Sequence, residues 1–198
     1  DLVRSRGLGD VYKRQKAESP GPSVSRLAPT VRSTAKILYT IYLLMTVLET
    51  VILLLCGMPI FDALTTAFGT AGTGGFGIRN DSMGGYSVTI QIVVTVFMIL
   101  FGINFNVYFL LLSRKWKQAL KNEEVRWYLA IILGAVLLIG WNIRGVYGSM
   151  GKAIQQAAFQ VASIITTTGF ATVDFNIWPE VSRTILVLLM FVGACAGS

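Results

Sequence analysis

Apolar residues in this chain occur in long blocks that are separated by shorter polar or glycine-rich segments. Three blocks, residues 36–56, 88–112 and 125–147, are each long enough to cross a bilayer, which takes about 20 largely apolar residues in a helix. A fourth block, residues 178–198, runs to the last residue of the chain. The pattern predicts an all-α membrane protein with four crossings.

Two semi-polar stretches, residues 58–70 and 152–165, are too short to span a bilayer and are predicted to be short helices. Each runs into a segment rich in threonine and glycine, residues 71–77 and 166–170, which cannot continue as regular helix. Asp62 lies near the start of the first short helix, where a carboxylate suits the positive end of the helix dipole.

The same order of elements occurs twice: spanning helix, short helix, Gly-Phe loop, spanning helix. Phe76 and Phe170, each directly after a glycine, place the two copies about 94 residues apart. Phe68 precedes its Gly-Phe pair by fewer residues than Phe159 does, so the two short helices should differ in length by a few residues. Repeated units around a central pathway are a common plan of transporters.

The two threonine- and glycine-rich segments point to a pathway for a small cation. Irregular backbone at membrane depth is tolerated only where protein or a water-filled path satisfies it. Rings of backbone carbonyls can replace the hydration shell of K⁺, threonine hydroxyls can supplement them, and the negative ends of two short helices would favour a cation. A phosphate-binding loop over residues 69–77 is disfavoured because the GK[ST] ending is absent.

Composition and charge agree with a membrane protein. Only 14% of the residues are charged and 54% are hydrophobic, whereas a soluble domain carries about 25% charged residues. The net charge of +7 comes from basic residues between the apolar blocks, which argues against a nucleic-acid partner. By the positive-inside rule, residues 16–35 and 113–126 are two basic cytoplasmic loops, and the two Gly-Phe loops lie on the outer side.

Catalysis is disfavoured because the chain contains no histidine, which removes Ser-His and Cys-His sites and His-ligated zinc. The distant alternatives are an intramembrane enzyme, for which only Ser149 and Lys152 lie close together, and a membrane scaffold. Cys56 and Cys195 are interpreted as small packing residues.

Several polar or small residues in the blocks leave a choice open. Glu49 should face protein or water, and a packing role is favoured over that of an ion ligand. Asn104 and Asn106 are interpreted as interhelical hydrogen-bonding residues. The spacing of Gly193 and Gly197 fits either a helix-packing face or a break in the helix.

Four segments carry a resemblance to a known family: GTAGTGGFGIRNDSM (69–83), FGINFN (101–106), FQVASIITTTGFATVDF (159–175) and WPEVSRTILVLLMFVGACAGS (178–198). The chain resembles the Trk/Ktr potassium uptake family, specifically its TrkH-type membrane subunit. The resemblance covers roughly residues 16–198. Residues 1–15 instead resemble translated sequencing-adapter stretches and are expected to be non-native.

The resemblance implies a plan of four M1–pore helix–filter loop–M2 repeats arranged like the four subunits of a K⁺ channel. This chain would hold the second repeat, residues 36–112 with filter loop 71–77. It would also hold the third, residues 127–198 with filter loop 166–170, truncated in its last helix. The first and fourth repeats would be missing, so two of four filter strands are expected here.

Carried over by motif, the K⁺-binding filter residues would be Gly72, Thr73, Gly74, Gly75, Thr166, Thr167, Thr168 and Gly169. Gly75 and Gly169 would be the one matched glycine of each repeat, which is fewer than in a strict K⁺ channel and implies looser discrimination against Na⁺. Gly193, Gly197 and Ser198 would begin an intramembrane loop that acts as the gate.

The resemblance also implies a setting: a multi-pass protein of the bacterial inner membrane that forms homodimers. Its partner would be a cytosolic nucleotide-binding regulatory subunit (TrkA/KtrA-like), with residues 113–126 as a candidate contact. K⁺ is expected as the transported ion, with no cofactor in this chain. The expected function is K⁺ uptake, with a Na⁺-permeable or Na⁺-coupled transporter of the same architecture as the alternative.

Overall fold

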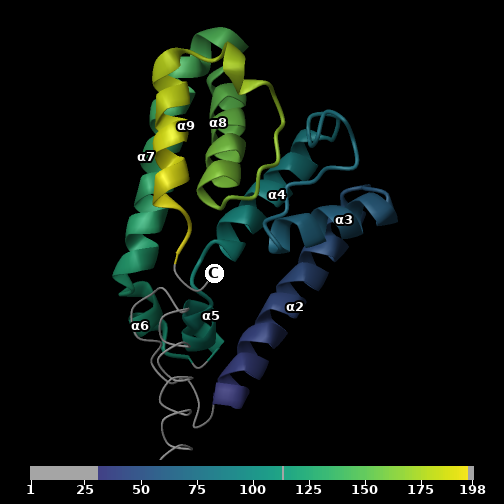
Figure 1. Cartoon of the computed structure of the whole chain (residues 1–198), viewed down its shortest axis with the longest axis vertical. Coiled ribbons are helices and arrows are strands. Elements are labelled where there is room, and N and C mark those ends of the chain that lie inside the picture. The colour runs from purple at the N-terminus through teal and green to yellow at the C-terminus, as the bar shows by residue number, and fades with distance from the viewer. Residues whose placement is uncertain (1–30, 113, 196–198) are drawn as a thin grey trace, which may run out of the picture.

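The computed structural model describes residues 31–112 and 114–195, and its regular elements in these ranges are all helices. In chain order they are α2 (Val31–Leu55), α3 (Ile60–Ala71), α4 (Val88–Phe101), α5 (Phe105–Leu112), α6 (Trp116–Leu120), α7 (Glu123–Tyr147), α8 (Met150–Ile165), the 3₁₀ turn η1 (Phe175–Ile177) and α9 (Glu180–Val192) (Figure 1). Segment 1–15, most of the predicted loop 16–35, and Gly197 and Ser198 lie outside the described residues.

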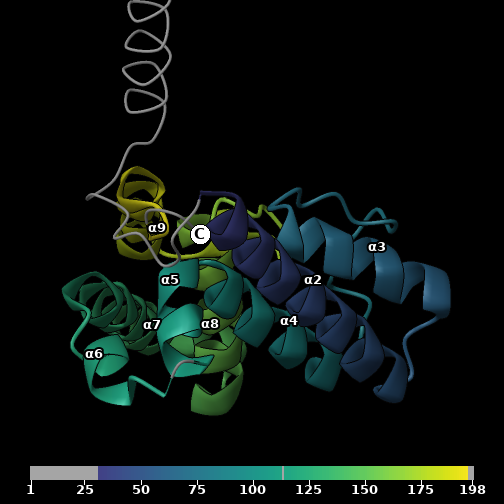
Figure 2. The same cartoon turned by 90° about the horizontal axis from the view of Figure 1, so that it is seen from below.

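The helices form two units, as the repeated order of elements predicts. In the first unit α2 contacts α3, α4 and α5, and in the second α7 contacts α8 and α9. Figure 1 shows α7, α8 and α9 side by side, and Figure 2 shows α2 crossing α4 next to α3. The two units meet where α4 contacts α8.

The short helices α3 and α8 differ in length, as predicted, with 12 and 16 residues. They end at Ala71 and Ile165, which occupy equivalent positions in the two copies, so the extra turn lies at the start of α8. This keeps the two predicted filter loops in register. Asp62 lies in the first turn of α3, as predicted.

Local sequence signals set several helix ends. Pro59 precedes α3 and Pro179 precedes α9, and proline suits these positions because it needs no hydrogen-bond acceptor there. The side chain of Asn122 accepts a hydrogen bond from the Val125 amide at the start of α7. Helix α2 begins at Val31, so the last residues of the predicted basic loop are helical.

The prediction of one continuous helix over residues 88–112 was wrong. Helices α4 and α5 are bent by 89° relative to each other, at a break after Phe101. The Asn104 side chain stabilises the break, because its oxygen accepts from the Asn106 amide at 2.9 Å and its nitrogen donates to Glu124 of α7 at 3.3 Å. The second contact confirms an inter-element hydrogen bond for Asn104.

Within residues 31–112 and 114–195, two helices are long and apolar enough to cross a membrane, Lys36–Leu55 within α2 and the whole of α7. The bent pair of α4 and α5 would be a third span. The last predicted span is also interrupted: α9 ends at Val192, and Gly193 has a φ of +69°. For Gly193 the structure therefore favours a break in the helix over a packing face.

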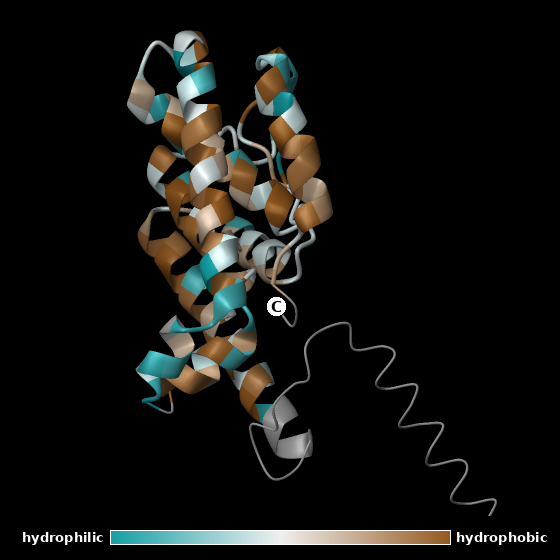
Figure 3. Cartoon of the chain, turned by 90° about the vertical axis from the view of Figure 1, so that its left-hand side faces the viewer, coloured by the Kyte–Doolittle hydropathy of each residue, from teal (hydrophilic) through white to brown (hydrophobic). Residues whose placement is uncertain are grey.

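Apolar side chains point outward along the helices, while several polar ones are buried. In α2, Leu44 is 61% exposed and Leu48 is 54% exposed, whereas Glu49 is completely buried. Figure 3 shows hydrophobic residues along the length of the helices and hydrophilic ones gathered mainly toward the ends. An outward apolar face is the arrangement that lipid requires.

A hydrogen bond in the loop before α4 gives a prediction on pH. The Tyr86 hydroxyl donates to Asp62 at 2.7 Å, and burial together with this bond raises the pKa of Tyr86 to about 12. Because the folded-state pKa lies above the unfolded value of about 10, the stabilisation is complete below pH ~10 and is lost as the pH rises toward 12. The Tyr86→Phe variant should therefore lose stability less steeply than the wild type over this range. Circular dichroism of the detergent-solubilised chain measures this, and identical slopes would contradict it.

Candidate selectivity filter

The two predicted filter loops have the same alternating backbone conformation. In the first, Thr73 and Gly75 have positive φ angles of 48° and 63°. In the second, 94 residues further on, Thr167 and Gly169 have φ angles of 57° and 90°. Among non-glycine residues this conformation is uncommon and strained, and such strain is concentrated at functional sites. Both loops therefore adopt a specific, repeated geometry that the residue pattern alone did not specify.

The two loops contact each other directly. A Cβ atom added to Gly75 would overlap the carbonyl oxygen of Thr168 and would lie 2.9 Å from its carbonyl carbon. A Cβ added to Gly169 would lie 4.0 Å from the Cα of Gly75, which is ordinary van der Waals contact without overlap. The sequence analysis placed Gly75 and Gly169 as matched residues. The structure brings them together but gives them different surroundings.

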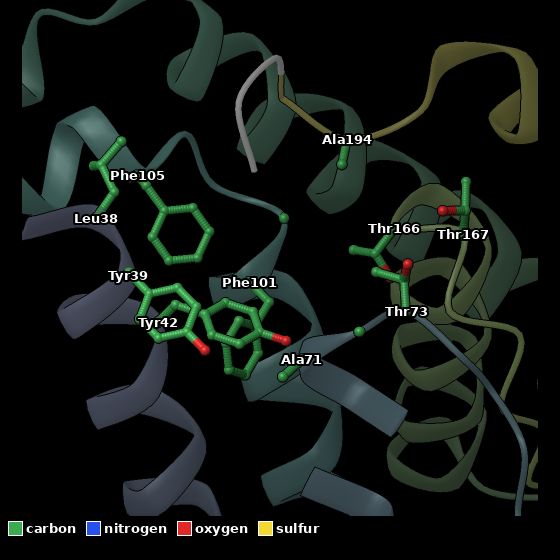
Figure 4. A pocket seen from close by; sticks show the side chains of 12 residues that line it. Leu38, Tyr39, Tyr42, Ala71, Thr73, Phe101, Phe105, Thr166, Thr167 and Ala194 are labelled. Atoms are coloured by element: carbon green, nitrogen blue, oxygen red, sulfur yellow. The ribbon is translucent and has the colours of Figure 1, made fainter. Parts of the chain in front are cut away.

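Both short helices end at one cavity of about 670 Å³. Ala71 and Gly72 at the end of α3 line it, as do Thr166 and Thr167 at the end of α8. The carboxyl ends of helices carry partial negative charge, so the two dipoles favour a cation there. Figure 4 shows the threonines and Ala194 on one side of this cavity, opposite a group of aromatic side chains.

The aromatic side of the cavity comes from α2 and from the break after α4. Tyr42 packs against Phe101 and Phe105, with ring centroids 5.7 Å and 6.2 Å apart. Ala194, just past the end of α9, also lines the cavity, and the amide of Cys195 donates to the carbonyl of Gly102 at 3.0 Å. The start of the predicted gate loop thus reaches the cavity that both predicted filter loops line.

The threonine hydroxyls of the second loop are used in two ways. The Thr166 hydroxyl donates to the carbonyl of Ala162 at 2.7 Å and also lies 2.8 Å from the Thr168 hydroxyl. Both side chains are buried, at 2% and 3% exposure. Thr166 and Thr167 of this loop and Thr73 of the first loop line the cavity, whereas Thr168 does not. The side-chain oxygens of Thr166 and Thr168 are therefore bonded within the second unit and support the loop.

Contacts behind the second loop fix its path, and the sequence analysis did not find them. The Ser163 hydroxyl donates to the carbonyl of Phe170 at 2.6 Å, and its carbonyl accepts from the amide of Thr168 at 2.9 Å. Ala171 pairs with the loop between α3 and α4 of the other unit, because its carbonyl accepts from the Met83 amide at 2.8 Å. The local sequence signal of these contacts is Ser163, a polar residue one turn before the threonine run that the structure buries.

The phenylalanines that end the two loops lie in opposite environments. Phe170 is 1% exposed, and a Cβ added to Gly69 of α3 would lie 2.9 Å from its ring. Phe76, the equivalent residue of the first loop, is 87% exposed. Phe170 therefore packs one unit against the pore helix of the other, whereas Phe76 has no such neighbour among the described residues.

Glu49 lies behind the first loop and not in the cavity. Its carboxyl group is completely buried next to Thr70, near the end of α3. The Thr70 hydroxyl donates to the Thr66 carbonyl at 2.9 Å, and neither oxygen of Glu49 accepts a hydrogen bond from the described residues. This position agrees with the predicted packing role for Glu49.

Comparisons with known proteins agree with this architecture. The sequence profile of the TrkH family, described as a cation transport protein, matches residues 11–198. The chain is 36% identical to the Trk system potassium uptake protein TrkH of Salmonella typhimurium over 92% of its length. It is 32% identical to the Trk system potassium uptake protein TrkG of Escherichia coli over 97% of its length.

A solved structure is also similar. The crystal structure of the potassium transporter TrkH from Vibrio parahaemolyticus superimposes with a TM-score of 0.82 and 34% sequence identity, covering 92% of this chain and 40% of that one. The chain spans about two fifths of the length of these relatives, 39% for the Salmonella protein and 40% for TrkG. A profile match over nearly the whole chain and this shared pore-helix repeat fold show that the chain belongs to the TrkH family of cation transport proteins.

Proposed function

We propose that the protein to which this chain belongs takes up K⁺ across the inner membrane, and that residues 71–77 and 166–170 form two strands of its selectivity filter. The observation that carries the proposal is the direct contact of the two loops at Gly75 and Thr168, at the ends of two convergent helices. Carbonyl oxygens held in this way can replace the water around a dehydrated alkali ion. The relatives named as potassium uptake proteins support K⁺ as the substrate.

The proposed ligands are the backbone carbonyls of Gly72 to Gly75 and of Thr166 to Gly169. Their alternating φ angles support this role, because a fixed, strained backbone can hold carbonyls in place without ion-induced rearrangement. Thr73 and Thr167 line the cavity, and their hydroxyls are proposed to coordinate the ion when it moves from the filter into the cavity.

The gate is proposed to begin at Gly193, with Gly197 and Ser198 continuing it. Its support is the end of α9 at this glycine and the course of residues 194–195 past the cavity to Gly102. A loop without regular hydrogen bonds can change shape at low cost, as a gate must. The two remaining filter strands would come from repeats outside this chain.

The setting of the protein is part of the proposal. We place residues 113–126 on the cytoplasmic side because of their basic charge, and propose a homodimer that works with a cytosolic nucleotide-binding regulatory subunit. The transported K⁺ is the only ion or cofactor proposed for this chain, and we propose no enzymatic reaction for it.

A serine at Gly169 tests the proposed filter. Gly169 has a φ of +90°, which disfavours any residue with a side chain, and a Cβ added there would lie 4.0 Å from the Cα of Gly75. In the full-length protein, Gly169→Ser should lower the K⁺/Na⁺ selectivity ratio by about tenfold, or 1.4 kcal/mol of discrimination. Ion flux into proteoliposomes measures the ratio, and an unchanged ratio would count against the filter assignment.

A Na⁺-permeable or Na⁺-coupled transporter is the second candidate, because the second loop has Thr166 and Thr168 where the first has Gly72 and Gly74, and fewer filter glycines fit looser discrimination against Na⁺. Uptake of Rb⁺ measured with and without Na⁺ separates the two. Uptake that needs Na⁺ indicates a coupled transporter, and uptake that is independent of Na⁺ indicates K⁺ permeation alone.

A further inference from the structure

A chain of side-chain hydrogen bonds links the two units on the far side of the filter from the cavity. The Thr172 hydroxyl, three residues after Gly169, donates to the side-chain oxygen of Gln156. Gln156 donates to Gln155 at 2.9 Å, and Gln155 donates across the unit boundary to Gln91 of α4 at 2.8 Å. Four side chains from two repeats are therefore joined in one line.

The line ends on the backbone of the first unit. The side-chain amide nitrogen of Gln91, Nε2, donates to the backbone carbonyl of Met83 at 3.0 Å and to that of Tyr86 at 3.2 Å. Gln91 is 4% exposed and Thr172 is 8% exposed, so water cannot readily replace a lost partner at either end. Because every bond runs in the same direction, each one polarises the next.

Backbone contacts run parallel to this line. The amide of Met83 donates to the carbonyl of Ala171 at 2.8 Å, and the amide of Ala171 donates to the Ser82 hydroxyl at 3.2 Å. A Cβ added to Gly84 would lie 2.9 Å from the carbonyl oxygen of Thr172. The segment directly after the second filter loop is thus attached to the loop between α3 and α4 of the first unit. The side-chain amide of Gln91 restrains that same loop.

We propose that Thr172, Gln156, Gln155 and Gln91 are positioning residues that set the second filter strand against the first. None of the four lies within the proposed filter loops 71–77 and 166–170. They act through the Phe170–Thr172 segment, which determines where the Thr168 carbonyl meets Gly75. The inference rests on the proposed filter function and adds a specificity determinant outside the filter itself.

A pair of substitutions at Thr172 tests the proposal in the full-length protein. Thr172→Val keeps the shape of the side chain and removes the hydroxyl, whereas Thr172→Ser keeps the hydroxyl. We expect the K⁺/Na⁺ flux ratio in proteoliposomes to fall by at least about threefold for valine and to stay within error of the wild type for serine. Thr184→Val is the matched control, because among the described residues the Thr184 hydroxyl bonds only to the Glu180 carbonyl of its own helix, and it should leave the ratio unchanged.

A second measurement separates positioning from simple stability and from failure of the proposed function. Hydrogen exchange of residues 168–172 should be faster in Thr172→Val than in Thr172→Ser. Faster exchange with an unchanged flux ratio would overturn the proposal, because the line would then only stabilise the fold. If the wild type itself does not discriminate K⁺ from Na⁺, the filter function fails. In that case the hydrogen exchange of residues 168–172 decides whether Thr172 positions the second loop. Equal exchange rates in Thr172→Val and Thr172→Ser would overturn this positioning role.

Discussion

Gly75→Ala is expected to lower K⁺ uptake by the full-length protein by at least about tenfold. Two physical effects add up at this glycine. Its φ of +63° is a conformation that costs a residue with a side chain about 1–2 kcal/mol. The new Cβ would also overlap the carbonyl oxygen of Thr168, which is backbone and cannot rotate away. Uptake of Rb⁺ into proteoliposomes or into cells that lack other K⁺ uptake systems measures the loss.

Gly169→Ala is the matched control for this prediction. Its φ of +90° is also unfavourable, but nothing lies closer than 4.0 Å to the position of the new Cβ. We therefore expect Gly169→Ala to retain several times more uptake than Gly75→Ala, at equal amounts of protein in the membrane. Equal losses in the two variants would mean that the contact between the loops has no part in conduction.

Truncation of Phe170 to alanine should destabilise the chain by about 3–5 kcal/mol, the usual cost of removing a buried phenylalanine. The Phe170 ring is buried against Gly69 of the other unit and within a cluster that includes Phe159 and Met98. Its loss leaves a cavity between the two units. Thermal or denaturant unfolding of the detergent-solubilised chain measures the change.

Phe76→Ala provides the comparison, because it makes the same chemical change at the equivalent position of the other repeat. Phe76 is 87% exposed, so in this chain its truncation should change the free energy of unfolding by less than about 0.5 kcal/mol. A similar loss for both variants would show that Phe170 does not join the units as described.

Much of the local structure follows from the sequence, because helices and loops depend on residues close together in the chain. The apolar blocks predicted α2 and α7, and the threonine–glycine segments predicted where α3 and α8 end. The 94-residue repeat predicted two equivalent loops, and their φ angles at Thr73 and Thr167 match. Glu49 was predicted to face protein or water, because a carboxyl group in lipid is costly, and it is buried within the protein.

The break after Phe101 is a case in which the local pattern was insufficient. Residues 88–112 are apolar enough for one helix, and Gly102 alone would not end it. The break is stabilised by partners far along the chain: Glu124 bonds to Asn104, and the amide of Cys195 bonds to Gly102. Such partners supply hydrogen bonds that a broken helix leaves open, and no pattern within the block could reveal them.

The sequence by itself determined the class of protein, the two repeats, and the residues that form the two loops. The length of an apolar block and the backbone freedom of glycine are properties of each segment alone, so the sequence is sufficient to predict them. Only the tertiary structure decided that the loops touch at Gly75 and Thr168, that Phe170 is buried while Phe76 is not, and that a line of glutamines joins the units. These are contacts between segments far apart in the chain, and their energy depends on how whole helices pack.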